Sequence, residues 1–269
     1  KVIESNIKTL QLIANDLEFE TANVREITKG ICANNEIFNF LDEKNREYFL
    51  KKNSEQTLIL NLKKLLDAKV LQDGKIAGMG IISNKGESIV ASRKKSDILW
   101  SISNKTSSYY KDILDCSKPE FFMMSCEKES LLVYVLPVYG FREFKESGKL
   151  FSVFTTDFIK KSISKNDSLN EQDLKNVTYV ITDDRNQRIY FNNETIDKGV
   201  LFPKYDQISK ERYTYCNVSG NKCIAFFNHI EEYNITITKI IQLKYIMQDI
   251  NLLSLIISLL FLLVISIIT

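Results

Sequence analysis

Two cysteines near the end of this 269-residue chain have a spacing that suits covalent pairing. Cys216 and Cys223 flank the segment 217–222, which contains Ser219 and Gly220. A Ser-Gly pair between two short apolar runs predicts a hairpin turn, so the two thiols would face each other across two strands. A disulfide between them is one interpretation, and a pair of reduced thiols is the other.

The remaining cysteines and the histidine give weaker evidence for a disulfide or for a functional site. Cys116 and Cys126 could bracket a connection between a loop and a strand, which would leave Cys32 as the odd thiol. Such bridges require an oxidising compartment. No CxxC pair occurs. His229 is the sole histidine of the chain, and no nucleophile motif points toward it. We therefore predict no metal site, no cofactor and no catalytic residue.

The charge of the chain is nearly balanced. There are 36 basic and 34 acidic side chains, for a formal net charge of +2, and the lysines are scattered along the sequence. Nucleic-acid binding proteins gather their basic residues on one face, so no nucleic-acid partner is predicted.

The C-terminal segment 252–269 is apolar, without a charge or a proline. At about 1.5 Å per residue this run is roughly 27 Å long, which is enough to cross the hydrocarbon core of a bilayer. The segment predicts a transmembrane helix, and a buried terminal helix is the alternative. Because the chain begins at Lys1 and stops at this span, we expect it to be a piece of a longer membrane protein.

The elements that must position these residues begin with a helical segment over 1–72. Apolar side chains recur at steps of three and four through the first 33 residues, at Ile3, Ile7, Leu10, Ala14, Leu17, Val24, Ile27 and Ile31. Asn34 and Asn35 are expected to end this helix and cap a short one over 37–41. A further helix is predicted from Ser54 to Leu71. Together they form a helical stalk.

At Asp73-Gly74 the periodicity changes from helical to strand-like. Five strands are predicted, at 76–83, 87–92, 120–125, 131–139 and 150–156, with a helical excursion over 95–115 after the second. A short helix opens at Asp157. Two strands, a helical excursion and an antiparallel meander of three form a PAS-like module over 73–165.

The pattern then repeats in shortened form over 166–240. Strands are predicted at 177–182, 187–191, 213–216, 223–228 and 235–241, and a polar stretch over 192–210 replaces the helix. Residues 241–269 are expected to form a helix that leads into the membrane span. The predicted fold class is α+β, with a long N-terminal stalk helix, two modules with antiparallel sheets and a C-terminal transmembrane helix.

Four segments carry a resemblance to a known family. They are GMGIISNKGESIVAS at 78–92, SLLVYVLPVYG at 130–140, GKLFSVFTTDFIKKSI at 148–163 and VTYVITDDRNQRIYF at 177–191. In this order, behind a long N-terminal helix, they resemble a double Cache domain, the tandem PAS-like sensor of bacterial receptors.

The resemblance implies a cell-membrane receptor with residues 1–250 on the extracytoplasmic side, and with no enzymatic activity in this part. Its output would be a histidine kinase, with a chemoreceptor or a diguanylate cyclase as alternatives. It further implies a homodimer along the stalk helix and a small-molecule ligand in the distal module. A membrane-tethered interaction module is the alternative from another functional class.

The ligand pocket would lie between the distal sheet and the 95–115 excursion. The resemblance places an acidic side chain and several aromatic ones there: Asp157, Tyr134, Trp100, Tyr110, Tyr109 and Tyr139. Core packing for the aromatic residues and a helix N-cap role for Asp157 are the alternatives. Relatives that bind amino acids carry an arginine just before the tryptophan, whereas Asp97-Ile98-Leu99 precede Trp100 here. An amine, a small organic acid or a sugar-like ring is therefore expected in place of an α-amino acid.

Overall fold

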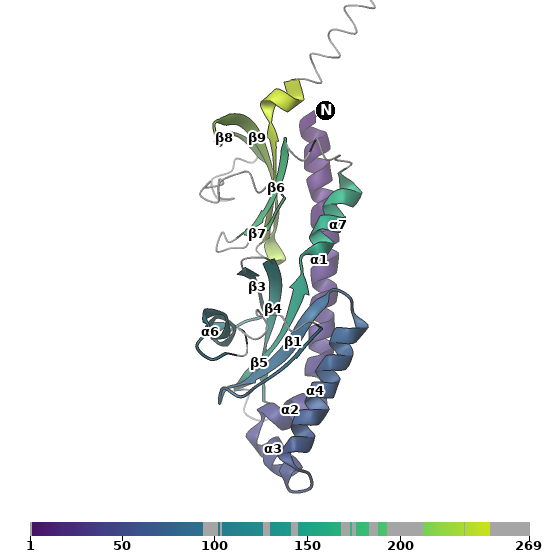
Figure 1. Cartoon of the computed structure of the whole chain (residues 1–269), viewed down its shortest axis with the longest axis vertical. Helices are drawn as coiled ribbons and strands as arrows, with labels where there is room; N and C mark the ends of the chain where they lie inside the picture. Colours follow the sequence, from purple (N-terminus) through teal and green to yellow (C-terminus); the bar gives the residue numbers. More distant parts are fainter. Residues whose placement is uncertain are drawn as a thin grey trace, which may run out of the picture. The chain divides into compact units, whose positions relative to one another are not determined.

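The computed structural model describes residues 2–93, 102, 104–125, 130–140, 145–167, 173, 176–182, 188–192, 212–233 and 235–247 (Figure 1). The chain divides into two compact units. One unit comprises residues 15–162, and the other comprises residues 1–14 together with 163–269. Each unit contains a five-stranded antiparallel sheet.

Four helices precede the first sheet: α1 (Val2–Cys32), α2 (Asn35–Leu41), α3 (Glu43–Leu50) and α4 (Glu55–Gln72). The side chains of Asn34, Asp42 and Ser54 cap α2, α3 and α4 by accepting a hydrogen bond from a backbone N–H of the first turn. Helices α1, α2 and α4 confirm the sequence-based prediction. Helix α3 was not predicted because it buries no residue and so shows no apolar periodicity.

The first sheet has the strand order β2-β1-β5-β4-β3. Its strands are β1 (Ile76–Ser83), β2 (Ser88–Ser92), β3 (Glu120–Ser125), β4 (Ser130–Tyr139) and β5 (Glu146–Thr155). The predicted strands match these closely, except that β5 begins four residues earlier than expected. The turn between β1 and β2 contains Gly86 with φ of 77°, a left-handed conformation that glycine adopts without strain.

The two faces of this sheet are covered by different helices (Figure 1). Helix α6 (Ser108–Asp115) lies against the face that carries Val133, Phe151 and Val153. Helices α1 and α4 lie on the other face, where Thr28 of α1 and Ser152 of β5 share a buried hydrogen bond of 2.7 Å. Because strand side chains alternate between faces, neighbouring residues of one strand belong to different environments.

The second sheet repeats this order as β7-β6-β10-β9-β8. Its strands are β6 (Val177–Thr182), β7 (Arg188–Phe191), β8 (Tyr213–Val218), β9 (Asn221–Ile230) and β10 (Ile235–Gln242). The predicted hairpin between β8 and β9 is confirmed. Ser219 and Gly220 form its turn with φ of 49° and 80°, and two consecutive positive φ angles are typical of a type I′ turn.

A buried ion pair joins the end of α7 (Asp157–Asn166) to the second sheet. Asp167 follows α7 directly, and its Oδ2 accepts hydrogen bonds of 2.5 Å from both Lys239 Nζ and Tyr179 Oη. The side chains of Lys239 and Asp167 are 5% and 15% exposed. Because all three polar groups lose hydration when the protein folds, each depends on the others for its hydrogen bonds.

The α+β class, the long N-terminal helix and the antiparallel sheets are confirmed by this structure. The predicted transmembrane segment at 252–269 lies outside the described residues. Within the described part of the chain, no helix has both the length and the apolar character that a membrane crossing requires.

Candidate ligand-binding site

The face of the first sheet that α6 covers carries a buried hydroxyl group. Tyr110 projects from α6 into the cluster of Ile82, Ile113 and Phe151, and it is 4% exposed. Its hydroxyl has no hydrogen-bond partner among the described residues. Burial also raises the pKa of this phenol. A buried hydroxyl without a partner is costly, so this one is available to a bound molecule.

The same face carries a buried cation. Lys149 stands two residues before Phe151 and four before Val153 on β5, so its side chain lies on the same face as theirs. It is 2% exposed. Its Nζ donates to the backbone carbonyl of Cys116 and, at 2.6 Å, to Glu146 Oε2. An ammonium group has three N–H donors, so among the described residues one donor remains unused. Figure 1 shows this sheet between α6 and the helices of the opposite face.

Sequence reasoning missed Lys149, although a signal for it exists. The residue stands just before the run 150–154, which is apolar except for Ser152, and two positions before Phe151. A period of two therefore places it on the side of the sheet that faces the core. A lysine at an inward position of a core strand is rare unless it is paired, and Lys149 is paired with Glu146, so the pattern marks a buried polar group on this face.

The structure brings together only part of the predicted site. Tyr109 and Tyr110 both lie on α6 and pack against the cluster on the α6 face of the first sheet, Tyr110 buried and Tyr109 half-buried. The backbone N–H of Tyr109 donates to Ser107 Oγ, which caps this helix. Trp100 lies outside the described residues.

The prediction that Tyr134 shares a pocket with Tyr110 is wrong. Tyr134 is buried on the opposite face of the sheet, where its ring stacks on Phe121 with centroids 4.6 Å apart. It pairs with Ser152, the residue that contacts α1. Its neighbours Val133 and Val135 are the ones that face α6. The alternation of side chains along β4 therefore separates the two tyrosines.

Asp157 follows the end of β5, and Tyr139 is the last residue of β4. Asp157 is exposed and forms the first residue of α7, so it stands inside the helix and not at the N-cap position that the sequence suggested. A carboxylate in the first turn still stabilises the helix through its dipole. Tyr139 ends β4, is 49% exposed, and its hydroxyl donates to the backbone carbonyl of Ser117 at 3.4 Å.

Cys216 and Cys223 are directly opposite each other in the β8–β9 hairpin, as predicted, and both are thiols in this structure. Burial raises the pKa of Cys216 to about 11, with a smaller contribution from Cys223. The disulfide between them stays a prediction. Cys116 is a buried thiol, and its predicted partner Cys126 lies outside the described residues.

The raised pKa of Cys216 predicts slow alkylation of the reduced protein. Near pH 8 this thiol should hold roughly 100-fold less thiolate than an ordinary cysteine, because thiolate is the reactive form. The rate should rise about tenfold per pH unit up to about pH 10. Iodoacetamide labelling followed by peptide mass spectrometry measures the alkylation rate of Cys216, and urea-unfolded protein is the control. Labelling of native reduced protein as fast as in urea would contradict this prediction.

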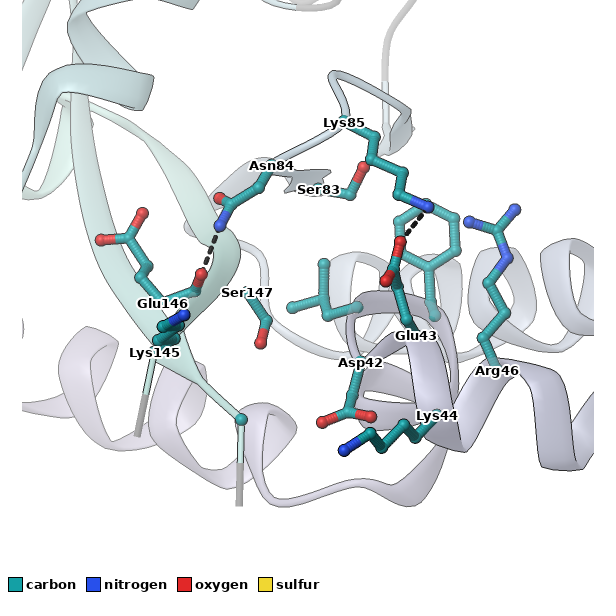
Figure 2. Close-up of a pocket in the computed structure, with 13 residues that line it drawn as sticks. Asp42, Glu43, Lys44, Arg46, Ser83, Asn84, Lys85, Lys145, Glu146 and Ser147 are labelled. Atoms are coloured by element: carbon teal, nitrogen blue, oxygen red, sulfur yellow. Dashed lines mark hydrogen bonds and ion pairs between the residues drawn. The ribbon is translucent and has the colours of Figure 1, made fainter. Parts of the chain in front are cut away.

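A concave feature lies at one end of the same unit. A cavity of about 260 Å³ opens between the α2–α3 junction, the β1–β2 turn and the start of β5 (Figure 2). We call it the α2–α3 pocket. None of the predicted site residues lines it. No group of side chains suited to a metal ion occurs among the described residues.

Comparison with known proteins gives matches at the level of structure. No family model matches this chain, and no curated protein matches it by sequence. The sensor domain of the histidine kinase DctB of V. cholerae aligns with a TM-score of 0.61 and 13% identity, over 90% of this chain and 97% of that one.

Chemoreceptor domains align with slightly lower TM-scores. The ligand-binding domain of Campylobacter jejuni Tlp3, in complex with L-norvaline, has a TM-score of 0.59 and 11% identity, over 91% and 92% of the two chains. That of Pseudomonas fluorescens CtaA, in complex with L-isoleucine, has a TM-score of 0.56 and 11% identity, over 90% and 94%. The chain has the fold of these sensor domains. The resemblance to double Cache domains is confirmed at the level of fold.

This sensor-domain fold explains why two sheets of the same strand order follow one another. At 11–13% identity the likeness concerns the arrangement of elements, and it assigns no ligand contact. The candidate ligand contacts therefore come from this chain's own α6 face, where Tyr110 and Lys149 lie.

Proposed function

We propose that this chain is the extracytoplasmic ligand-sensing domain of a membrane-bound bacterial signal transduction receptor. The observation that carries the proposal is the agreement in fold with sensor domains over at least 90% of the chain, through both modules. Sensing requires only differential affinity of a ligand for two arrangements of the domain. This fragment would thus bind a ligand and transmit a change, without a reaction of its own.

We assign the ligand to the α6 face of the first sheet and expect a small organic acid. Lys149 has an N–H donor to offer there, and the buried hydroxyl of Tyr110 adds a second. A carboxylate could accept from both; Glu146 already pairs with the ammonium group of Lys149, so the ligand would add a further acceptor to this cation. Tyr109, Trp100, Asp157 and Tyr139 remain proposed contributors from the sequence.

The proposed output is a histidine kinase, with a chemoreceptor or a diguanylate cyclase as alternatives. The apolar segment 252–269 would carry the signal through the membrane. A homodimer along α1 is supported by two exposed apolar side chains, Leu12 and Phe19, which stand seven residues apart. Residues with this spacing lie on one face of a helix and suit a helix–helix seam.

A thermal-shift screen of the full chain in detergent against organic acids, amines and sugars tests the ligand assignment. Binding stabilises the folded state by about 2.7 kcal/mol when the ligand is at 100 times its Kd. We expect stabilisation by a carboxylate-bearing compound, and loss of most of it in Tyr110→Phe and in Lys149→Met.

Tyr48→Phe is the matched control, because it removes the same hydroxyl from an exposed tyrosine of α3. A hit that both site variants retain would place the ligand elsewhere. Stabilisation by no compound in the screen would favour the alternative of a membrane-tethered interaction module, whose partner is another protein.

A further inference from the structure

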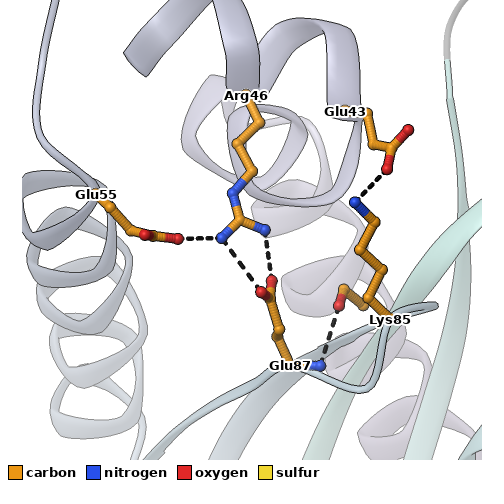
Figure 3. A network of polar contacts seen from close by, with 6 residues as sticks. Glu43, Arg46, Glu55, Lys85 and Glu87 are labelled. Atoms are coloured by element: carbon orange, nitrogen blue, oxygen red, sulfur yellow. Dashed lines mark hydrogen bonds and ion pairs between the residues drawn. The ribbon is translucent and has the colours of Figure 1, made fainter.

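The walls of the α2–α3 pocket are held by ion pairs. Arg46 of α3 binds Glu87 at 2.5 Å and also pairs with Glu55, while Lys85 of the β1–β2 turn pairs with Glu43 (Figure 3). Glu87 raises the pKa of Arg46, and Lys85 lowers the pKa of Glu43. These contacts fasten α3 to the β1–β2 turn. The pocket is therefore formed before any ligand arrives.

Two oxygen atoms converge inside this pocket beside a glycine. Asp42 Oδ1 accepts from Asn45 N–H as the N-cap of α3, which leaves Oδ2 directed toward Gly140. A Cβ added at Gly140 would lie 3.1 Å from Asp42 Oδ2 and 3.1 Å from Ser147 Oγ. Neither oxygen has another hydrogen-bond partner among the described residues. A carboxylate and a hydroxyl on the same side of a glycine form an acceptor site for a small cation.

The pocket also contains cationic side chains. Glu43 and Arg46 are engaged in the ion pairs of its walls, and Glu146 binds the buried Lys149. Lys145 lines the pocket, is exposed, and has no ion-pair partner among the described residues. In the view of Figure 2, Ser147 lies between Lys145 and Asp42. Lys44 of α3 also lines the pocket, so the pocket presents the oxygens of Asp42 and Ser147 together with the ammonium groups of Lys44 and Lys145.

We propose that the α2–α3 pocket is a second ligand site, which binds a small zwitterion. The ammonium group of the ligand binds Asp42 and Ser147, and its carboxylate binds Lys145. The volume of about 260 Å³ lies just below the range of sites for drug-sized molecules and suits a compound of a few heavy atoms. The proposed ligand contacts here differ from those on the α6 face, although Glu146 lines this pocket and also pairs with Lys149 of that face.

Isothermal titration of the full chain in detergent tests this site with three matched probes. β-Alanine carries both charged groups, ethylamine only the ammonium and propionate only the carboxylate. We expect saturable binding of β-alanine that is about tenfold or more tighter than that of either partial probe. Equal binding of ethylamine or of propionate would overturn the assignment to a zwitterion, and no binding of β-alanine would overturn the site.

Three substitutions locate the binding. Asp42→Asn removes the charge and keeps a good N-cap, so α3 stays capped while β-alanine binding weakens about tenfold or more. Gly140→Ala fills the space between the two oxygens and should abolish binding, and Lys145→Gln should weaken it. Gly30→Ala is the control, because nothing lies within 4 Å of a Cβ at that position. Binding that survives Asp42→Asn and Gly140→Ala, or is lost in Tyr110→Phe, would refute this location.

Discussion

Asp167→Ala is expected to lower the free energy of unfolding of the second module by about 3–5 kcal/mol. The carboxylate accepts hydrogen bonds from both Lys239 and Tyr179, which are 4% and 0% exposed. Removing it leaves a buried ammonium group and a buried hydroxyl without their acceptor. Breaking one partner of a buried ion pair costs more than the pair itself contributes, because the remaining charge cannot regain its hydration.

Urea unfolding combined with hydrogen exchange of β6 and β10 measures this loss, since exchange reports on each sheet separately. The double variant Asp167→Ala/Lys239→Met removes both charges and should be less destabilised than Asp167→Ala alone. The methionine retains much of the apolar length of the lysine. A loss below about 1 kcal/mol in Asp167→Ala would show that the ion pair is hydrated and dispensable.

Gly148→Ala is the second substitution with a large expected effect, a loss of about 3 kcal/mol in the first module. A Cβ at this position would lie 2.3 Å from the backbone oxygen of Ile82 and 2.7 Å from Leu41 Cδ2. Gly148 pairs with Ser83 of β1 and with Val138 of β4, so it stands in the middle of the sheet. The backbone oxygen cannot move aside without breaking the β1–β5 ladder.

Gly30→Ala provides the matched control for this substitution. Gly30 lies inside α1, and nothing lies within 4 Å of a Cβ there. Alanine should stabilise the helix by about 0.5–1 kcal/mol, because it restricts the unfolded backbone. The two variants are compared by urea unfolding with hydrogen exchange of β1 and β5 as the local readout. Equal stability of both variants would show that β1 and β5 can separate at Gly148 without loss.

Local patterns were sufficient to predict most of the elements. The apolar repeat of α1, the caps at Asn34 and Ser54, and the Ser219-Gly220 turn each depend on residues close in sequence. Such signals are encoded in spacing and in side-chain capacity for local hydrogen bonds. Helix α3 was not predicted, because its side chains are all at least partly exposed and so give no apolar periodicity.

The candidate site was predicted less well, because it depends on which strand positions share a face across several strands. Tyr134 and Tyr110 were grouped because the resemblance to double Cache domains implied that both border the pocket. The register of β4 against β3 and β5 places Tyr134 toward α1 and leaves Lys149 with Tyr110 on the α6 face. A shift of one residue reverses this assignment for a whole strand, so register must be known before the site can be assembled.

The sequence by itself determined the α+β class, the order of the two modules and the apolar C-terminal segment, because periodicity and hydropathy are local properties. Only the tertiary structure decided that Asp167 pairs with Lys239 over a separation of 72 residues, and that Asp42 and Ser147 both lie beside Gly140. These contacts bring together segments that are distant along the chain. Their geometry follows from strand order and packing, which no local pattern encodes.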